Sequence, residues 1–278
     1  MLMSFVRASR PRFWMYIVGP IGLAFALRLT QGDLSWSISL FLFTLYCIIP
    51  ANLLIYGIND IFDYETDILN QKKQGYEAVL DPTYRPRMWQ AVLISQLVVL
   101  PVLYAAWGQT PFLFAFLAFV CTGIFYSAPP IRAKVRPIFD GLCNVLYILP
   151  AFAWYYLSGG EGFSLVTLLS GWAWCIAMHA YSAISDISAD RAAGLDTVAT
   201  LLGHRYTVIY CAVLYGASAL GAALVLHPIL AILGVPYVWM MMRTYVATES
   251  QSFLYYRQFP LINACVGAIL WWSIIWFL

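Results

Sequence analysis

The 278-residue chain carries few charges for its length: 62% of its residues are hydrophobic and 10% are charged, whereas soluble domains average about 25% charged residues. This composition and a mean hydropathy of +0.77 are typical of integral membrane proteins and argue against a soluble globular domain. The net charge of +2 gives no reason to expect a nucleic-acid partner. The expected surroundings are a lipid bilayer.

Apolar segments recur along the whole chain. A hydrocarbon core of about 30 Å requires about 20 consecutive residues of helix. By this measure the sequence predicts an all-α integral membrane protein with about nine transmembrane helices. The predicted ranges are 12–29, 37–57, 87–107, 111–128, 138–158, 164–185, 206–226, 229–246 and 259–278.

The basic residues separate by side if these segments cross the membrane alternately. One side then holds almost all of them: Arg7, Arg10, Arg12, Lys72, Lys73, Arg85, Arg87, Arg132, Lys134, Arg136, Arg191, Arg205, Arg243 and Arg257. The positive-inside rule therefore predicts a multi-pass protein with a cytoplasmic N-terminus and an extracytoplasmic C-terminus. Arg28 falls on the opposite side, near a helix end, where its stem is expected to snorkel toward water.

The first cluster of acids follows the second predicted helix, in the stretch YGINDIFDYETDILNQKK. Asn59, Asp63 and Asp67 are four residues apart, and Asp60 is three and seven residues from the two later acids. At about 100° per residue, these four side chains fall on one face of a helix, whereas Glu65 points elsewhere.

The second cluster follows the sixth predicted helix. Asp186 and Asp190 are four residues apart and are expected to share a face at the cytoplasmic end of that span. His179, two turns deeper, is interpreted as a buried, hydrogen-bonded histidine in preference to a catalytic one. Asp140 and Asn144, one turn apart at the start of the fifth predicted helix, are interpreted as a structural polar pair that could also line a cavity.

Converging carboxylates repel one another unless a cation intervenes. Hard oxygen ligands select Mg²⁺, Mn²⁺ or Ca²⁺, and Mg²⁺ is usually held by one or two carboxylates together with phosphates of the substrate. A metal-bridged diphosphate between the two clusters would explain both of them. The alternative is that these acids belong to ordinary loops and pair with Lys72, Lys73 or Arg191.

The basic loop YSAPPIRAKVRP has the complementary character for a diphosphate. Arg132, Lys134 and Arg136 alternate with apolar residues, and Tyr126 offers a hydroxyl near the same loop. The positive-inside bias alone explains these cations equally well, and the same two interpretations apply to Arg10.

The acidic motifs resemble those of the UbiA superfamily of intramembrane prenyltransferases. Asn59-Asp60-Ile61-Phe62-Asp63-Tyr64-Glu65-Thr66-Asp67 matches its NDxxDxxxD motif, and Asp186 to Asp190, followed by Arg191 and Gly194, matches its DxxxD motif. The resemblance covers the whole chain, so it implies one domain over 1–278, a helical bundle around a central cavity open to the bilayer. The segments SRPRFWMYIVGP and YSAPPIRAKVRPIFDGLCNVLYILP look like those of the lycopene elongase branch.

That resemblance implies Mg²⁺-dependent prenyl transfer. An allylic diphosphate donor, dimethylallyl diphosphate, would react through an allylic carbocation with the end of a hydrophobic carotenoid acceptor such as lycopene. It implies Asn59, Asp63, Asp67, Asp186 and Asp190 as metal ligands, with the four aspartates catalytic. The residues implied to bind the diphosphate are Asn59, Asp60, Arg10, Tyr126, Arg132, Lys134 and Arg191.

The second motif departs from the family pattern in one respect. Ile187-Ser188-Ala189 lies between its two acids, where many members carry another acidic residue, so fewer carboxylates remain for a second metal. Two rival functions stay open at this point. One is a UbiA-type enzyme acting on an aromatic, quinone or haem precursor, and the other is an ion-coupled membrane transporter, because acids in membrane segments also mark ion pathways.

Overall fold

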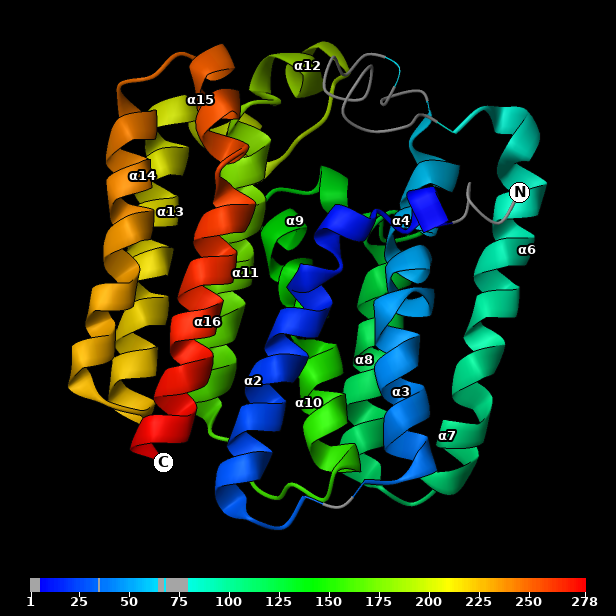
Figure 1. Cartoon of the computed structure of the whole chain (residues 1–278). Coiled ribbons are helices and arrows are strands. Elements are labelled where there is room, and N and C mark those ends of the chain that lie inside the picture. Colours follow the sequence, from blue (N-terminus) through cyan, green and yellow to red (C-terminus); the bar gives the residue numbers. More distant parts are fainter. Residues whose placement is uncertain (1–5, 35, 65–67, 69–79) are drawn as a thin grey trace. The chain divides into compact units, whose positions relative to one another are not determined.

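The computed structural model describes residues 6–34, 36–64, 68 and 80–278, and every regular element in these ranges is a helix (Figure 1). The all-α prediction is therefore confirmed. The chain divides into two units. Unit 1 comprises Met1–Ala133 and Leu146–Glu161, and unit 2 comprises Lys134–Val145 and Gly162–Leu278. The single domain expected over 1–278 stays a prediction.

Unit 1 holds seven α-helices in its described part. They are α2 (Met15–Gln31), α3 (Ile38–Ile48), α4 (Pro50–Phe62), α6 (Arg85–Gln96), α7 (Leu100–Ala105), α8 (Thr110–Phe125) and α10 (Leu149–Leu157), with the 3-10 turns η1 (Pro11–Phe13), η2 (Pro82–Tyr84) and η3 (Leu97–Val99). α3 and α4 follow each other along one rod, as do α6 and α7 (Figure 1). α10 packs against α2 and α8, and α4 packs against α6.

Unit 2 is built around the pair α11 and α13. Its α-helices are α9 (Phe139–Leu142), α11 (Leu165–Ile184), α12 (Ile187–Ala192), α13 (Val198–Val225), α14 (Val235–Tyr245), α15 (Glu249–Tyr256) and α16 (Phe259–Phe277), with the 3-10 turn η6 (Pro228–Gly234). The 3-10 turns η4 (Ala133–Val135) and η5 (Cys143–Tyr147) flank α9 in the sequence. α13 also packs against η6 and α14.

Each predicted transmembrane range falls on helix in the structure. Among the described residues, five helical segments are long and apolar enough to cross a membrane: Pro11–Gln31, Ile38–Phe62, Pro82–Ala105, Val198–Val225 and Glu249–Phe277. α8 is apolar but shorter. The positions of the helices are thus confirmed, and the count of nine crossings stays a prediction.

The boundary between α3 and α4 shows how this apolar chain tolerates a proline within a span. Pro50 has no backbone N–H, so the rod is interrupted and nearby carbonyl groups lose their helical donors. The Asn52 amide donates to the carbonyl oxygens of Cys47 (3.2 Å) and Ile48 (2.8 Å). Gln96 of α6 donates to the carbonyl of Pro50 at 3.2 Å. Polar side chains thus replace the missing bonds where water cannot reach.

Arg28 corrects an expectation from the sequence. Only 2% of this residue is exposed, so its side chain is buried and does not snorkel. The guanidinium lies 2.7 Å from the Asp33 carboxylate and donates to the carbonyl of Ser158 at 3.0 Å. The chain can bury this cation because a carboxylate and a carbonyl oxygen face it. It therefore ties the end of α2 to the end of α10.

Candidate active site

The first acidic motif lies where α4 ends. α4 stops at Phe62, and Asp63 is its C-cap residue with φ −110° and ψ 4°. The Asn59 amide nevertheless donates to the Asp63 carboxylate at 2.5 Å, so the two side chains are adjacent. The single helical face expected from Asn59 to Asp67 is wrong in that helix α4 ends before Asp63. Asp67 itself lies outside the described residues.

The partly buried cation Arg10 completes this cluster. Its Nη2 donates to the Asp60 carboxylate at 2.7 Å and to the Asn59 amide oxygen at 3.5 Å, and its guanidinium lies 4.8 Å from the centre of the Tyr56 ring. The side chains of Arg10 and Asp60 are 13% and 7% exposed. Two charges this far from water require each other. Asp60 therefore faces Arg10, and Asn59 lies beside both the cation and Asp63.

Arg10 reaches this position through an unusual backbone. Its φ is +50° and its ψ 73°, the left-handed conformation, at the N-cap of η1 and directly before Pro11. A residue with a Cβ atom adopts this conformation at a cost of about 1–2 kcal/mol. Such conformations persist where surrounding contacts hold them, and the ion pair with Asp60 and the ring of Tyr56 supply such contacts.

Aromatic side chains lie one turn before the acids on α4. The Tyr56 and Tyr147 hydroxyls are 3.1 Å apart, and the ring centres of Phe13 and Tyr56 are separated by 5.7 Å. Tyr16 packs edge-on against Tyr147, with ring centres 6.1 Å apart. Aromatic faces attract cations, and the Arg10 guanidinium already lies over the face of Tyr56, so a carbocation would be stabilised by the other rings of this cluster.

Ser127 is a contact that the sequence reasoning missed. Its hydroxyl, in a residue only 1% exposed, accepts a hydrogen bond from the Asn59 amide at 3.1 Å. It follows directly after Tyr126, the C-cap of α8, at the start of the basic loop. In the sequence, only the position of Ser127 between Tyr126 and the basic loop pointed to this contact. Arg132, with a left-handed φ of +46°, lies half-buried in the same loop.

The second acidic motif does not continue the sixth predicted span. α11 ends at Ile184, and Asp186 is the N-cap of a separate helix, α12, which is six residues long. The two acids thus follow the predicted span of 164–185, as expected, but on a short helix of their own. The Asp190 amide donates to the Asp186 carbonyl at 2.8 Å, so the two residues still stand one turn apart.

Arg191, predicted to bind diphosphate, is exposed and donates to the carbonyl of Thr200 at 2.9 Å. Glu249, at the first position of α15, was not singled out from the sequence. Its carboxylate accepts hydrogen bonds from the backbone N–H (2.9 Å) and the hydroxyl (2.5 Å) of Ser188 in α12. The capping box of Thr248 and Gln251 could have predicted from the sequence that a helix starts at Glu249, but not that Glu249 contacts Ser188.

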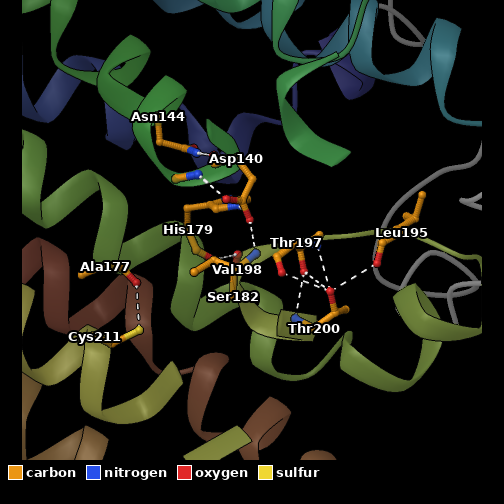
Figure 2. A network of polar contacts seen from close by, with 11 residues as sticks. Asp140, Asn144, Ala177, His179, Ser182, Leu195, Thr197, Val198, Thr200 and Cys211 are labelled. Atoms are coloured by element: carbon orange, nitrogen blue, oxygen red, sulfur yellow. Dashed lines mark hydrogen bonds and ion pairs between the residues drawn. The ribbon is translucent and has the colours of Figure 1, made fainter. Parts of the chain in front are cut away.

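Asp140 is the most deeply buried acid in unit 2, with 0% exposure. Its carboxylate accepts from the N–H groups of Gly141 (2.8 Å) and Val198 (2.7 Å), and His179 Nε2 lies 3.6 Å away (Figure 2). Asn144 donates to the Asp140 carbonyl at 2.5 Å, so the predicted structural pair is confirmed. The Asp140 carboxylate also accepts from the backbone N–H of Val198, the first residue of α13, which the sequence did not predict.

The oxygen donors of both motifs fit a hard divalent cation by type. No group of three or more His, Cys, Asp or Glu side chains able to hold a metal ion occurs among the described residues, which exclude Asp67. Asn59 and Asp63 in one unit, and Asp186 and Asp190 in the other, offer amide and carboxylate oxygens. Mg²⁺ commonly binds one or two carboxylates and takes its other ligands from phosphate and water.

Comparison with known proteins decides the family. A profile of the UbiA prenyltransferase family matches residues 17–274. The chain belongs to this family. It is therefore an enzyme, a prenyltransferase, and an integral membrane protein, and the transporter alternative is set aside.

Relatives within the UbiA family are similar over nearly the whole chain. The lycopene elongase/hydratase of Halobacterium salinarum is 37% identical over 270 residues, which cover 94% of this chain and 93% of the relative. The lycopene elongase/hydratase of Corynebacterium glutamicum is 30% identical over 274 residues, which cover 95% of this chain and 93% of the relative. The resemblance to this branch of the family is confirmed.

Solved structures support the fold. A UbiA homolog from Archaeoglobus fulgidus bound to DMAPP and Mg²⁺ matches with a TM-score of 0.69 over 99% of both chains, at 18% sequence identity. The apo structure of a UbiA homolog from Aeropyrum pernix gives a TM-score of 0.70 at 14% identity, over 94% of this chain and 98% of the homolog. At these identities the similarity shows the UbiA fold alone.

Proposed function

We propose that the protein transfers a prenyl group from an allylic diphosphate, dimethylallyl diphosphate, to the end of an acyclic carotenoid such as lycopene, and that it requires Mg²⁺. The observation that carries the donor half of this proposal is the cluster at the end of α4. There the amide nitrogen of Asn59 donates to the Asp63 carboxylate, and its amide oxygen accepts from the partly buried guanidinium of Arg10. A carboxylate and an amide oxygen next to a guanidinium suit a metal-bound diphosphate.

The proposed metal ligands are Asn59, Asp63, Asp67, Asp186 and Asp190. Bound Mg²⁺ would supply Lewis-acid stabilisation of the negative charge that develops on the departing diphosphate. Arg10 would donate to the same diphosphate, and Asp60 and Tyr56 hold its guanidinium in place. Tyr126, Arg132, Lys134 and Arg191 remain proposed diphosphate contacts.

The bond changes follow from the chemistry of an allylic diphosphate. The bond between the allylic carbon and oxygen breaks, and both electrons leave with the diphosphate. The terminal double bond of the carotenoid then supplies the pair for the new carbon–carbon bond. The resulting cation loses a proton, or takes up water and then loses a proton. The aromatic rings near Tyr56 and Tyr147 would stabilise the allylic carbocation. Apolar surroundings would keep water from this cation until the carotenoid reacts with it.

The acceptor half of the proposal rests on the relatives. Those named lycopene elongase/hydratase are 30–37% identical over almost the whole chain. A 2-acylphloroglucinol 4-prenyltransferase of Humulus lupulus is 26% identical over 200 residues, which cover 66% of this chain and 44% of that protein. An acyclic carotenoid is therefore favoured, and an aromatic acceptor is the second candidate.

The test is expression of the full chain in a host that makes lycopene, followed by mass spectrometry of the pigments. We expect products heavier than lycopene by one or two five-carbon units. Asp63→Ala or Asp190→Ala should lower their rate of formation at least about 100-fold, because a metal ion contributes several kcal/mol and 1.36 kcal/mol is tenfold in rate. Glu161→Ala, an exposed acid in unit 1, is the matched control and should leave the rate unchanged.

Two results would contradict the proposal separately. Prenylated benzoate or quinone precursors without any enlarged carotenoid would move the acceptor to the aromatic class. Wild-type rates in purified Asp63→Ala or Asp190→Ala protein would show that these carboxylates are not part of the metal site.

A further inference from the structure

We propose that Asp140 and Glu249 are positioning residues that hold the second acidic motif, Asp186 to Asp190, from outside the diphosphate site. The inference rests on the proposed function, because it assumes that this motif binds metal and diphosphate. Both residues lie in unit 2 together with the motif. Neither belongs to the family motifs that the sequence displays.

The helix that carries the motif is too short to hold its own position. α12 spans only Ile187–Ala192, six residues, whereas isolated helices shorter than about 12–15 residues are marginal in water. Its geometry therefore depends on contacts with neighbouring elements. The structure shows a direct contact at Ser188, in its first turn, and hydrogen bonds that connect its last turn to the start of α13.

Asp140 holds the segment that follows the C-terminal end of α12. Its buried carboxylate accepts the N–H of Val198, the first residue of α13, at 2.7 Å, and that of Gly141 at 2.8 Å (Figure 2). Val198 opens a short helical stretch that a kink at Gly203 (φ 72°, ψ 174°) separates from the rest of α13, and the carboxylate satisfies a donor that has no partner within this stretch. The start of α13 is thereby fixed to α9.

A chain of hydrogen bonds leads from the start of α13 to Asp190. Thr197 and Thr200 form a capping box, and the Thr200 hydroxyl shares its hydrogen between the carbonyls of Thr197 at 3.1 Å and Leu195 at 3.2 Å (Figure 2). The Leu195 amide in turn donates to the carbonyl of Asp190 at 2.8 Å. Arg191 adds a second connection through the Thr200 carbonyl, at 2.9 Å. A shift of α13 at Val198 is therefore transmitted to the backbone of the motif.

Glu249 supplies the contact at the N-terminal turn. Its two carboxylate oxygens accept from the N–H and the hydroxyl of Ser188, between Asp186 and Asp190. Ser188 occupies the stretch where the family pattern often has another acid. Here the carboxylate comes from α15 and faces the backbone of α12. It orients the turn between the two aspartates by charge-assisted hydrogen bonds.

The first experiment measures binding without catalysis. Full-length protein in detergent is titrated with Mn²⁺ in the presence of inorganic pyrophosphate, and bound Mn²⁺ is followed by electron paramagnetic resonance. Asp140→Asn keeps the shape of the side chain but turns an amide donor toward one of the two N–H groups. We expect the Mn²⁺ affinity to fall about 10- to 100-fold, the usual effect of removing a group that orients metal ligands.

A second variant tests the same contact from the other side. Val198→Pro removes the N–H that Asp140 accepts, and proline is well tolerated at the first position of a helix. Thr197 precedes it with φ −121° and ψ 167°, a conformation that a following proline allows. Val198→Pro should weaken Mn²⁺ binding as Asp140→Asn does, and the double variant should be no worse than either alone. The control is Thr207→Val, which removes a buried hydrogen bond further along α13.

The Glu249 contact is tested by a double-mutant cycle. Glu249→Gln and Ser188→Ala should each raise the KM for the diphosphate donor at limiting Mg²⁺, about threefold to tenfold, and leave the thermal midpoint within a degree or two. Their effects should not add, because each removes the same contact. Additive effects would mean that the two residues act independently.

The outcomes separate the inference from the proposed function. A wild-type chain that does not bind Mn²⁺ with pyrophosphate contradicts both. Wild-type binding with unchanged affinity in folded Asp140→Asn and Val198→Pro overturns the Asp140 part, and an unchanged KM in Glu249→Gln overturns the Glu249 part. If Asp140→Asn does not fold, Val198→Pro decides the question for Asp140.

Discussion

Buried Asp60 and partly buried Arg10 form an ion pair between residues 50 positions apart in the sequence. Coulomb attraction at low dielectric offsets the loss of hydration only while both partners are present. The pair also places a cation beside Asn59 and over the face of Tyr56. One guanidinium thus contacts Asp60 and Asn59 at once, and we propose that its contact with Asp60 serves stability while its side toward Asn59 serves diphosphate binding.

These two roles can be separated by substitution. Arg10→Ala removes the guanidinium that lies 2.7 Å from the Asp60 carboxylate and should lower the free energy of unfolding by about 1–3 kcal/mol. Combining it with Asp60→Asn should restore most of the stability but none of the lost prenyl transfer. Thermal denaturation in detergent and donor KM are the measurements. The control is Arg7→Ala at an exposed residue, and recovery of activity in the double variant would contradict the binding role.

Local patterns predicted which residues cluster but not their partners. The four-residue spacing of Asn59 and Asp63 was sufficient to expect adjacent side chains, because helical neighbours follow from the period alone. The contact of Arg10 with Asp60 depends on how η1 meets α4, which no local pattern records. The burial of Arg28 likewise depends on Asp33 and Ser158. The position of Arg28 near a helix end had instead predicted that its guanidinium reaches water.

At the scale of elements, α11 and α13 approach closely where small residues meet. A methyl group added at Gly221 of α13 would lie 1.7 Å from the Ser170 hydroxyl oxygen and 2.8 Å from its Cβ. Small residues allow membrane helices to pack at short distance, where dispersion contacts hold them together. This contact is therefore sensitive to a single methyl group.

Gly221→Ala should lower the free energy of unfolding by about 1–3 kcal/mol, the usual cost of overpacking. Adding Ser170→Gly removes the clashing atoms and should recover part of the loss. Gly216→Ala is the matched control on the same helix, because nothing lies within 4 Å of its added methyl group. It should be neutral or slightly stabilising. Thermal midpoints of the four proteins are compared, and equal losses at Gly216 and Gly221 would refute the close approach.

Helix boundaries near the acids were the least predictable elements. Hydrophobicity located the helices well because each span must be apolar over most of its length. The ends at Phe62 and Ile184 are not marked by glycine or proline. Asp63 ends α4 by its own backbone conformation, and Asp186 starts α12 as its N-cap. The four-residue spacing of the acids is the same whether they lie within a helix or beyond its end, so the spacing could not locate these boundaries.

For the whole molecule, the distribution of basic residues predicts on which side of the membrane each chain end lies. Nine crossings place the two chain ends on opposite sides, with the C-terminus outside the cytoplasm. Alkaline phosphatase fused after Leu278 should be active, and the same enzyme fused after Ala193 should be inactive. A fluorescent protein at the C-terminus should stay dark in the periplasm. An inactive phosphatase with a bright fluorescent protein would indicate an even number of crossings.

Function at this scale was predictable because the two acidic motifs are short and local. The residues that we propose to support them were not, since Glu249 of α15 contacts Ser188 of α12 and Asp140 of α9 contacts Val198 of α13. Neither the hydrophobic period nor a motif marks a side chain that meets a backbone more than 50 residues away. Such contacts become visible only when the helices are placed in three dimensions.

The left-handed turn at Arg10 has a practical consequence for anyone purifying this protein. The segment that brings Arg10 to Asp60 begins within the first ten residues, and its shape depends on the hydrogen bond from the Arg10 amide to the Arg7 carbonyl at 3.0 Å. A tag or cleavage scar that disturbs residues 7–10 is therefore expected to displace Arg10 from Asp60 and to lower prenyl transfer, whereas one placed after Leu278 leaves this turn intact.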